Sequence, residues 1–189
     1  MKLLVITGSV NDRNGNIASS TLSALKLKDN IKKDFKEVEI IDLNNSEFAT
    51  NMLNSNTFDQ YFKNSEEWIF KLKNTDFIIF ATSMTNFGYT AVVKNFIDKI
   101  CLAKQSFKYK YDGSGLSKGL ITRPKIQIIT SQGAPKGWYP FGDHTTQLKG
   151  TFEFLGMNVL EPIIIHGTKT PKNRDKSNSE IVETIELNY

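Results

Sequence analysis

The strongest constraint on the fold is a regular alternation of short apolar runs with segments of helical spacing. The apolar runs lie at residues Leu3–Ile6, Lys36–Leu43, Asp76–Ala81, Lys125–Thr130 and Val159–Ile165. Each is four to eight residues long and bounded by polar or turn-forming residues, which is typical of strands. Strands that alternate with helices predict a parallel sheet covered by helices on both faces. Five such strands within residues 1–189 favour a single domain, a three-layer α/β/α sandwich with strand order 2-1-3-4-5.

Capping residues mark the expected helices. Thr90 and Asp143 are predicted N-caps, and Ser177 with Glu180 forms a predicted capping box. Gly156 is the expected C-terminal stop of the helix that starts after Asp143. The helix after the first strand is expected to face the core with Ile17, Ala18, Thr21, Leu22 and Leu25.

Three stretches outside this alternation have weaker patterns. Residues 44–57 are polar and rich in Asn, which predicts a mobile loop. Helical spacing then returns at Phe58, Tyr61, Phe62, Ile69 and Leu72. Residues 107–120 are rich in Tyr, Lys and Gly and are expected to form a hairpin or a similar excursion from the sheet.

Composition excludes several classes of protein. The single cysteine, Cys101, excludes an internal disulfide and a Cys-rich metal cluster, and it fits a reducing compartment. No apolar run approaches the roughly 20 residues of a membrane span, so we expect a cytoplasmic protein. The net charge of +4 comes from 24 Lys and Arg against 20 Asp and Glu, spread along the chain and with only three arginines. This favours a solvated lysine surface over a nucleic-acid interface.

The expected topology brings three loops together at one edge of the sheet. Gly8–Asn16, Thr82–Thr90 and Thr130–Asp143 all follow the carboxyl ends of predicted strands. In such sheets a ligand binds where the strand order reverses, beside strands one and three. All three loops are rich in Gly, Ser, Thr, Asn and aromatic residues, which expose backbone N–H groups and leave room for a flat ring.

The first loop is a candidate phosphate site. It lacks the spacing of an NTPase loop and of a dinucleotide-binding glycine motif. A polar loop that opens a helix can still bind a phosphate through the free N–H groups of the first turn. Ser9, Asn16 and Ser19 can add side-chain donors, although Asn16 can equally be a simple N-cap.

The second and third loops offer walls for a planar ligand. Phe87 and Tyr89 flank Gly88, and Gly133 is followed by Trp138, Tyr139 and Phe141. Ordinary loop packing explains any one of these aromatics equally well. Gly133 permits a close approach of backbone to a ligand.

Other chemistries find little support in the sequence. His144 and His166 have no carboxylate or Cys spacing that completes a metal site, so no metal is expected. His144 is interpreted as a polar first-turn residue, and His166 ends the fifth strand within reach of solvent. Cys101 shares an apolar helix face with Ile97 and is expected in the core. No G-x-S-x-G motif supports a hydrolase.

Five blocks of sequence, taken together and in order, resemble one known family. They are Met84-Thr85-Asn86-Phe87, Lys94-Asn95-Phe96-Ile97-Asp98, Ser106-Phe107-Lys108-Tyr109, Lys118-Gly119-Leu120 and Ser131-Gln132-Gly133. This pattern resembles the FMN-dependent NADH-azoreductases, a bacterial family with a flavodoxin-like fold that is related to the quinone reductases. The resemblance is close over about residues 77–156 and looser over the first strand and loop.

The resemblance implies a homodimer with one FMN per subunit and an exchange in two steps. NADH passes a hydride to the flavin and leaves, and a quinone or azo compound then takes the electrons. The protein supplies binding, orientation and electrostatics, so no catalytic side chain is expected. Backbone N–H groups near Gly133 would stabilise the charge that reduction places on the pyrimidine side of the ring. Dimerisation also fits the aromatic loop residues Phe107, Tyr109, Tyr111, Trp138 and Tyr139.

The family's cofactor contacts carry over onto three segments. The residues that would hold the phosphate are Ser9, Asn16, Ile17, Ala18 and Ser19. Those that would line the isoalloxazine ring are Met84, Thr85, Asn86 and Phe87, and those on its pyrimidine side are Ser131, Gln132, Gly133 and Ala134. Thr85 replaces the family's usual Tyr, Ala134 replaces its second Gly, and Pro135–Trp138 is also atypical.

Three other functions remain open at this stage. They are a flavodoxin-type electron carrier without its own substrate, an NADPH-preferring nitro- or iron-reductase, and a sugar-phosphate or nucleotide binder that uses the first loop alone. The excursion at residues 107–120 argues against a simple carrier, because a carrier needs no wall over the flavin.

Overall fold

A six-stranded sheet forms the centre of the molecule in the computed structural model, which describes residues 1–109 and 117–187. Its strands are β2 (Glu37–Asp42), β1 (Lys2–Thr7), β3 (Phe77–Ser83), β6 (Lys125–Ser131), and β7 (Asn158–Val159) with β8 (Ile163–Ile165). All pairs in this sheet are parallel, in the order β2-β1-β3-β6-β7, with β8 also on β6. The predicted order 2-1-3-4-5 is therefore confirmed.

The central strand is the most apolar one, as the sequence predicts. All seven residues of β3 are buried, because helices cover both faces of the sheet and neighbours pair with both of its edges. By contrast β2 lies at an edge, where Val38 and Ile40 are 42% and 50% exposed.

The predicted fifth strand at residues 159–165 is wrong in one respect, because it is broken into β7 and β8. Pro162 stands in the gap and has no N–H to donate to β6. The buried side chain of Gln127 partly compensates, since its Nε2 donates to the carbonyl oxygen of Ile128 in β6 at 3.1 Å and to that of Glu161 at 2.9 Å. Both short strands still pair with β6.

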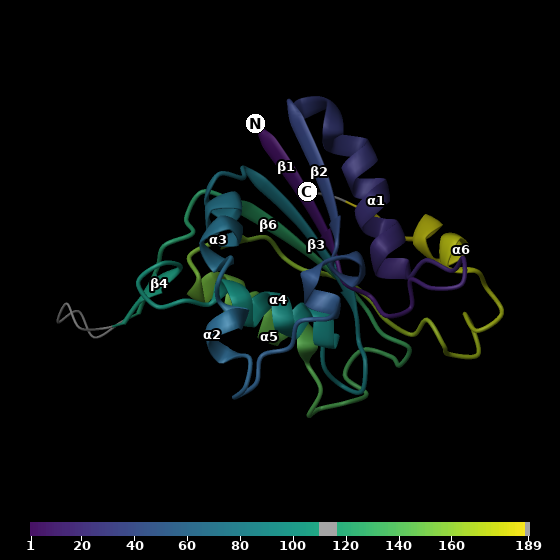
Figure 1. The fold of residues 1–189 in the computed structure, drawn as a ribbon. Helices are drawn as coiled ribbons and strands as arrows, with labels where there is room; N and C mark the ends of the chain where they lie inside the picture. Colours follow the sequence, from purple (N-terminus) through teal and green to yellow (C-terminus); the bar gives the residue numbers. More distant parts are fainter. Residues whose placement is uncertain (110–116, 188–189) are drawn as a thin grey trace.

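Helices cover the two faces of the sheet unequally (Figure 1). On one face, α1 (Ser19–Ile31) and α6 (Asn178–Glu183) contribute to a core with Leu3, Val5 and Ile79. On the other, α3 (Ser65–Lys73), α4 (Ala91–Ile100) and α5 (His144–Phe154) enclose a larger core. The short elements are α2 (Phe58–Tyr61) and the 3₁₀ turns η1 (Lys32–Asp34), η2 (Leu43–Asn45) and η3 (Glu47–Ala49).

The expected core face of the first helix is wrong in part, because Ala18 and Thr21 are buried but the other three residues are not. Ile17 precedes α1 and is 40% exposed, while Leu22 and Leu25 are only partly buried. The buried face instead includes Ser20, Ala24, Leu27 and Ile31 at helical spacing. Small residues at the first of these positions allow the helix to approach the sheet closely, so apolarity alone misidentifies the face.

The polar stretch at residues 44–57 is more structured than a mobile loop. Phe48, within η3, is 1% exposed and packs against Trp68 and Phe96 with ring centroids 5.0 and 5.4 Å apart. Its carbonyl oxygen accepts a hydrogen bond from Asn95 Nδ2 at 2.9 Å. One buried aromatic thus anchors a segment whose composition suggests a loop.

The predicted caps are confirmed. The side chains of Thr90, Asp143 and Ser177 accept from the backbone N–H groups of Val93, Thr146 and Glu180, and the Ser177–Glu180 capping box is complete. Gly156 has a φ of +99°, the left-handed conformation expected of a C-terminal stop. The base of the predicted hairpin is the antiparallel pair β4 (Phe107–Lys108) and β5 (Lys118–Gly119). Residues 110–116, including Tyr111, lie outside the described residues.

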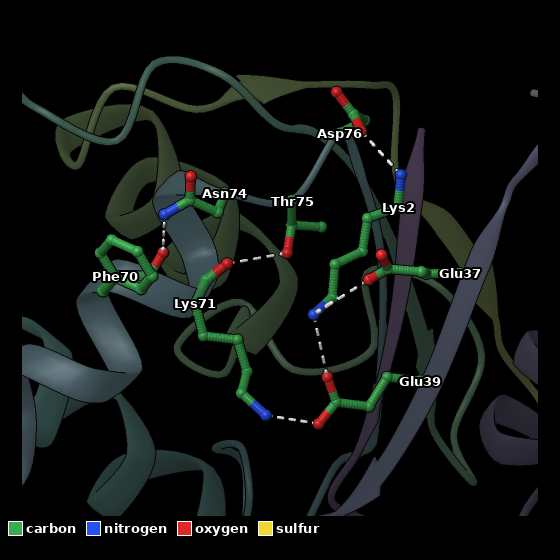
Figure 2. Close-up of polar contacts among 8 residues, drawn as sticks. All are labelled: Lys2, Glu37, Glu39, Phe70, Lys71, Asn74, Thr75 and Asp76. Atoms are coloured by element: carbon green, nitrogen blue, oxygen red, sulfur yellow. Dashed lines mark hydrogen bonds and ion pairs between the residues drawn. The ribbon is translucent and has the colours of Figure 1, made fainter.

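The amino ends of the strands carry a connected set of ion pairs (Figure 2). Lys2 Nζ lies 3.4 Å from Glu39 and 3.8 Å from Glu37, and Lys71 also pairs with Glu39. Asp76 accepts from the backbone N–H of Lys2 at 2.6 Å, and Arg123 lies 2.9 Å from its carboxylate. At this edge each of these cations has a carboxylate partner.

Candidate functional site

The carboxyl ends of the strands bring the first and third predicted loops around one cavity of about 530 Å³. Of the predicted phosphate residues, Asn16, Ala18 and Ser19 line this cavity, together with Ser131. The others that line it are Asn11, Arg13, Asn14, Thr168, Lys169, Arg174, Lys176 and Asn178. The cavity therefore joins the start of α1 to a C-terminal segment in which no site residue was predicted.

The first turn of α1 is open toward this cavity. Ala18 occupies the N-cap position with an extended backbone, and no side chain caps the turn. Asn16 is therefore not the N-cap; it pairs with Arg13 in the loop. Asp12 holds the turn in place, because its carboxylate accepts from the Ala18 N–H and the Thr21 hydroxyl, each at 2.7 Å. An uncapped helix start has free N–H groups, which suit an anion.

Two predicted phosphate residues are placed differently. Ser9 is fully buried, and its hydroxyl lies 2.7 Å from the hydroxyl of Ser83. Ile17 is exposed, and its carbonyl oxygen accepts from Asn178 Nδ2 at 2.8 Å. Ser9 thus joins the carboxyl ends of β1 and β3, and Ile17 links the first loop to α6.

Four cations surround this first cavity: Arg13, Lys169, Arg174 and Lys176. Arg174 pairs with the exposed Asp175, and the other three have no ion pair among the described residues. The described lining contains no carboxylate. The signal was available in the sequence, since residues 169–176 hold four of the chain's cations within eight positions.

A second cavity, of about 510 Å³, lies between the second and third loops. Five predicted ring residues line it: Met84, Asn86, Phe87, Gly133 and Ala134. Its remaining described lining is Pro135, Trp138, Tyr139, Lys169 and Thr170. Most of this lining consists of apolar or aromatic side chains, and Gly133 contributes only backbone. Such a lining is typical of sites for planar ligands.

The aromatic wall is built on unusual backbone geometry. Asn86 and Phe87 have left-handed φ values of +46° and +73°, within a turn closed by hydrogen bonds between Thr85 and Gly88. Phe87 packs against Tyr139 and Phe141 with ring centroids 5.0 Å apart in each pair. Non-glycine residues adopt such φ values at a cost, and functional sites are a common place for it.

Comparison with known proteins identifies the family. The chain matches the family model described as flavodoxin-like fold over residues 1–187. It belongs to this flavodoxin-like family. It is 41% identical to an FMN-dependent NADH:quinone oxidoreductase of Mycoplasmopsis synoviae, over 96% of this chain and 92% of that one. A similarly named protein of Mesoplasma florum is 42% identical, over 97% and 94% of the two chains.

Solved structures agree on the fold of this flavodoxin-like chain. An azoreductase from Bacillus anthracis superposes with a TM-score of 0.75 at 19% identity, over 97% of this chain and 94% of that one. An FMN-dependent NADH-azoreductase of the same species, in complex with FMN, gives 0.73 at 18%, over 97% and 93%. The family expected from the five sequence blocks is therefore confirmed.

Two of the predicted ring residues lie off the main cavities of this flavodoxin-like domain. Thr85 is bonded to Gly88 and does not line either cavity. The side chain of Gln132 donates to the carbonyl oxygens of Ala134 and Pro135 at 3.1 and 3.0 Å, and it faces a separate cavity of about 180 Å³. Both residues therefore stabilise the loop conformations and do not line the two main cavities.

The titratable residues singled out from the sequence do not line the two main cavities. His144 is 1% exposed, neither ring nitrogen has a partner among the described residues, and burial lowers its pKa to about 4. It lies in the first turn of α5, as expected, and it is buried and neutral there. Burial raises the pKa of Cys101 to about 11, so its thiol is protonated at neutral pH. His166 is exposed, as expected.

Neither a metal cluster nor a membrane span is found in the part of the chain that is described. No three His, Cys, Asp or Glu side chains gather there closely enough to hold a metal ion. No described helix has the length and apolarity needed to cross a bilayer.

Proposed function

We propose that this chain is an FMN-dependent oxidoreductase that takes a hydride from NADH and passes the electrons to quinones or azo compounds. The observation that carries the proposal is the pair of cavities at the carboxyl edge of the sheet: one cationic, one apolar, joined at Lys169. A flavin mononucleotide has the matching division into a phosphate and a planar ring. The relatives named as NADH:quinone oxidoreductases support the same activity.

The described residues fit FMN at both ends. The uncapped start of α1 and the cations Arg13, Arg174 and Lys176 would hold the phosphate, since charge-assisted hydrogen bonds to phosphate are the strong ones. Met84, Asn86 and Phe87 would line one side of the ring. Gly133 and Ala134 would meet its pyrimidine edge. Four other predicted residues line neither cavity, and their hydrogen bonds hold these segments in place: Ser9, Ile17, Thr85 and Gln132.

Bound FMN supplies the redox chemistry by accepting a hydride and passing on two electrons. The chain's part is to bind, orient and shield. Phe87, Tyr139 and Phe141 form an aromatic cluster beside the second cavity, which would shield one side of a bound ring. Among the described residues that line the two cavities there is no carboxylate and no histidine, so no side-chain acid or base is assigned.

A homodimer is part of the proposal. Trp138 and Phe141 are 66% and 71% exposed beside the second cavity, and aromatic residues are enriched at interface cores. Phe107, by contrast, is 6% exposed and packs on Phe154 within the chain, so it is removed from the expected interface set. Light scattering at working concentration tests the dimer, and a mass of 21.4 kDa would contradict it.

The activity is tested on the purified chain with added FMN. We expect the absorption spectrum of bound flavin, and consumption of NADH only when a quinone or azo dye is present. An electron carrier would bind FMN but leave NADH unconsumed. Faster consumption of NADPH than of NADH would favour the NADPH-preferring reductase. A chain that does not bind FMN would favour the sugar-phosphate or nucleotide binder.

A further inference from the structure

Lys169 occupies the junction of the two cavities. It is the one described residue that lines both of them. It comes from the segment that follows β8, which no sequence motif singled out. Its side chain is exposed and makes no ion pair among the described residues.

The backbone around Lys169 is fixed against the third loop. The N–H groups of Gly167, Thr168 and Lys169 donate to the carbonyl oxygens of Ala134, Gln132 and Gly133 at 2.8, 3.2 and 3.0 Å. Gly167 has a φ of +71°, and its carbonyl oxygen accepts from the Thr170 hydroxyl at 2.8 Å. These three consecutive hydrogen bonds fix the Cα of Lys169 relative to the third loop, and therefore relative to a ligand in either cavity.

The stem of Lys169 lies directly over Gly133. A Cβ added at Gly133 would come within 3.2 Å of both Cγ and Cδ of Lys169. Because Gly133 has no side chain, the stem of Lys169 can lie against this part of the third loop. Packing the methylenes against the loop leaves the ammonium as the free end.

The charges of the two cavities differ, and this decides what Lys169 serves. The first cavity has three further cations and an open helix start for a phosphate. In the second cavity, Lys169 is the sole charged residue among the described lining. Among the described residues that line the second cavity, Lys169 is therefore the cation that can stabilise a negative charge on a ring bound there.

We propose that Lys169 contacts the cofactor and favours the reduced over the oxidised state of FMN, an inference that rests on the proposed function. A hydride brings two electrons and one proton, so NADH becomes NAD⁺ and the FMN ring gains one negative charge. Lys169 stays protonated throughout, and no bond to it forms or breaks. Its contribution is electrostatic and acts only after the ring is charged.

The test compares Lys169→Met with the unaltered protein. Methionine keeps an unbranched stem over Gly133 but removes the charge. We measure the dissociation constants of oxidised and reduced FMN and the midpoint potential of the complex. The preference for reduced FMN should fall about tenfold, which for a two-electron couple is a potential about 30 mV more negative. Lys169→Arg should restore most of the preference.

Lys176→Met is the matched control, because Lys176 comes from the same region but lines only the first cavity. It should weaken both redox states of FMN equally and leave the potential unchanged. Riboflavin, which lacks the phosphate, supplies the second control. The shift caused by Lys169→Met should persist with riboflavin.

Two results would overturn the proposal. One is an unchanged midpoint potential in Lys169→Met. The other is an equal loss of affinity for both redox states that disappears with riboflavin, which would assign Lys169 to the phosphate. Should Lys169→Met not fold, Lys169→Gln provides the same comparison. Failure of the proposed function is seen separately, as an unaltered protein that binds no FMN or consumes no NADH.

Discussion

The two ends of the sheet use positive charge in opposite ways. At the amino ends, Lys2 and Lys71 each pair with a carboxylate (Figure 2), and Arg123 pairs with Asp76. At the carboxyl ends, Arg13, Lys169 and Lys176 surround a cavity without an ion pair among the described residues. Cations with partners contribute to folding, whereas clustered cations without partners repel one another until an anion binds. The distribution of ion pairs therefore separates the amino edge of the sheet from the edge at which we propose that FMN binds.

The largest expected effect is on ligand binding at the carboxyl edge. The double variant Arg13→Met, Lys176→Met should weaken FMN binding by at least about 100-fold, because two charge-assisted contacts of roughly 1.5–3 kcal/mol each together contribute at least about 3 kcal/mol. Riboflavin affinity should stay within a factor of two. Fluorescence titration measures both.

The matched control for this variant is Lys2→Met, Lys71→Met at the amino edge. It removes the same number of charges and should leave FMN affinity unchanged. An equal loss of FMN affinity in both double variants would mean that net charge, not position, governs binding.

The next largest effect is on stability at the amino edge. Asp76→Ala removes the acceptor for the Lys2 N–H and for Arg123, and we expect a loss of about 1 kcal/mol because Arg123 is more than half exposed. Asp76→Asn keeps an acceptor oxygen and should lose less. Urea unfolding of the ligand-free protein measures both, and equal losses would show that the charge of Asp76 is responsible.

A smaller effect is the dependence of stability on pH. The hydrogen bond from the Lys2 N–H lowers the pKa of Asp76, and Arg123 lowers it further. Burial raises the pKa of Glu39, but the ion pairs with Lys71 and Lys2 outweigh burial and leave this pKa lowered. Carboxyls with lowered folded pKa values stabilise the fold above their unfolded values of about 4 and lose this contribution as the pH falls further. Between pH 5 and 3 the loss should be shallower in the double variant Asp76→Asn, Glu39→Gln. Urea midpoints at each pH measure it, and parallel curves would contradict the assignment.

The smallest effect is that of salt on the folded, ligand-free protein. Raising the salt from 0.05 to 0.5 M should leave stability nearly constant, because screening weakens attraction at the amino edge and repulsion at the carboxyl edge together. FMN affinity should fall severalfold over the same range. A large salt-induced change in ligand-free stability would show that one edge dominates.

Much of the fold was predictable because local signals agree with the final packing. The seven buried residues of β3 follow a continuous apolar run, and Thr90, Asp143 and Ser177 cap their helices with their own side chains. The two loops that line the second cavity followed from their position after strands β3 and β6, and the family resemblance singled out residues within them. In these places each residue's neighbours along the chain determine the structure.

The failures concern tertiary contacts. The core face of α1 was misidentified because Ser20 and Ala24 lie against the sheet while Ile17 is exposed. Phe48 anchors a polar segment through rings contributed by α3 and α4. Lys169, Arg174 and Lys176 reach the first cavity only because the segment after β8 folds back over the loop before α1. No local pattern encodes such a return of the chain.

The interruption at Pro162 also limits how this molecule can associate wrongly. A continuous outer strand is a template on which another unfolded chain can add, and nature commonly blunts such borders. Here β7 and β8 have two and three residues, and a buried glutamine side chain already occupies the Glu161 carbonyl between them. Growth of a fibril-like ladder from this side is therefore disfavoured, and the six-residue β2 on the opposite border is left as the one to protect during refolding or concentration.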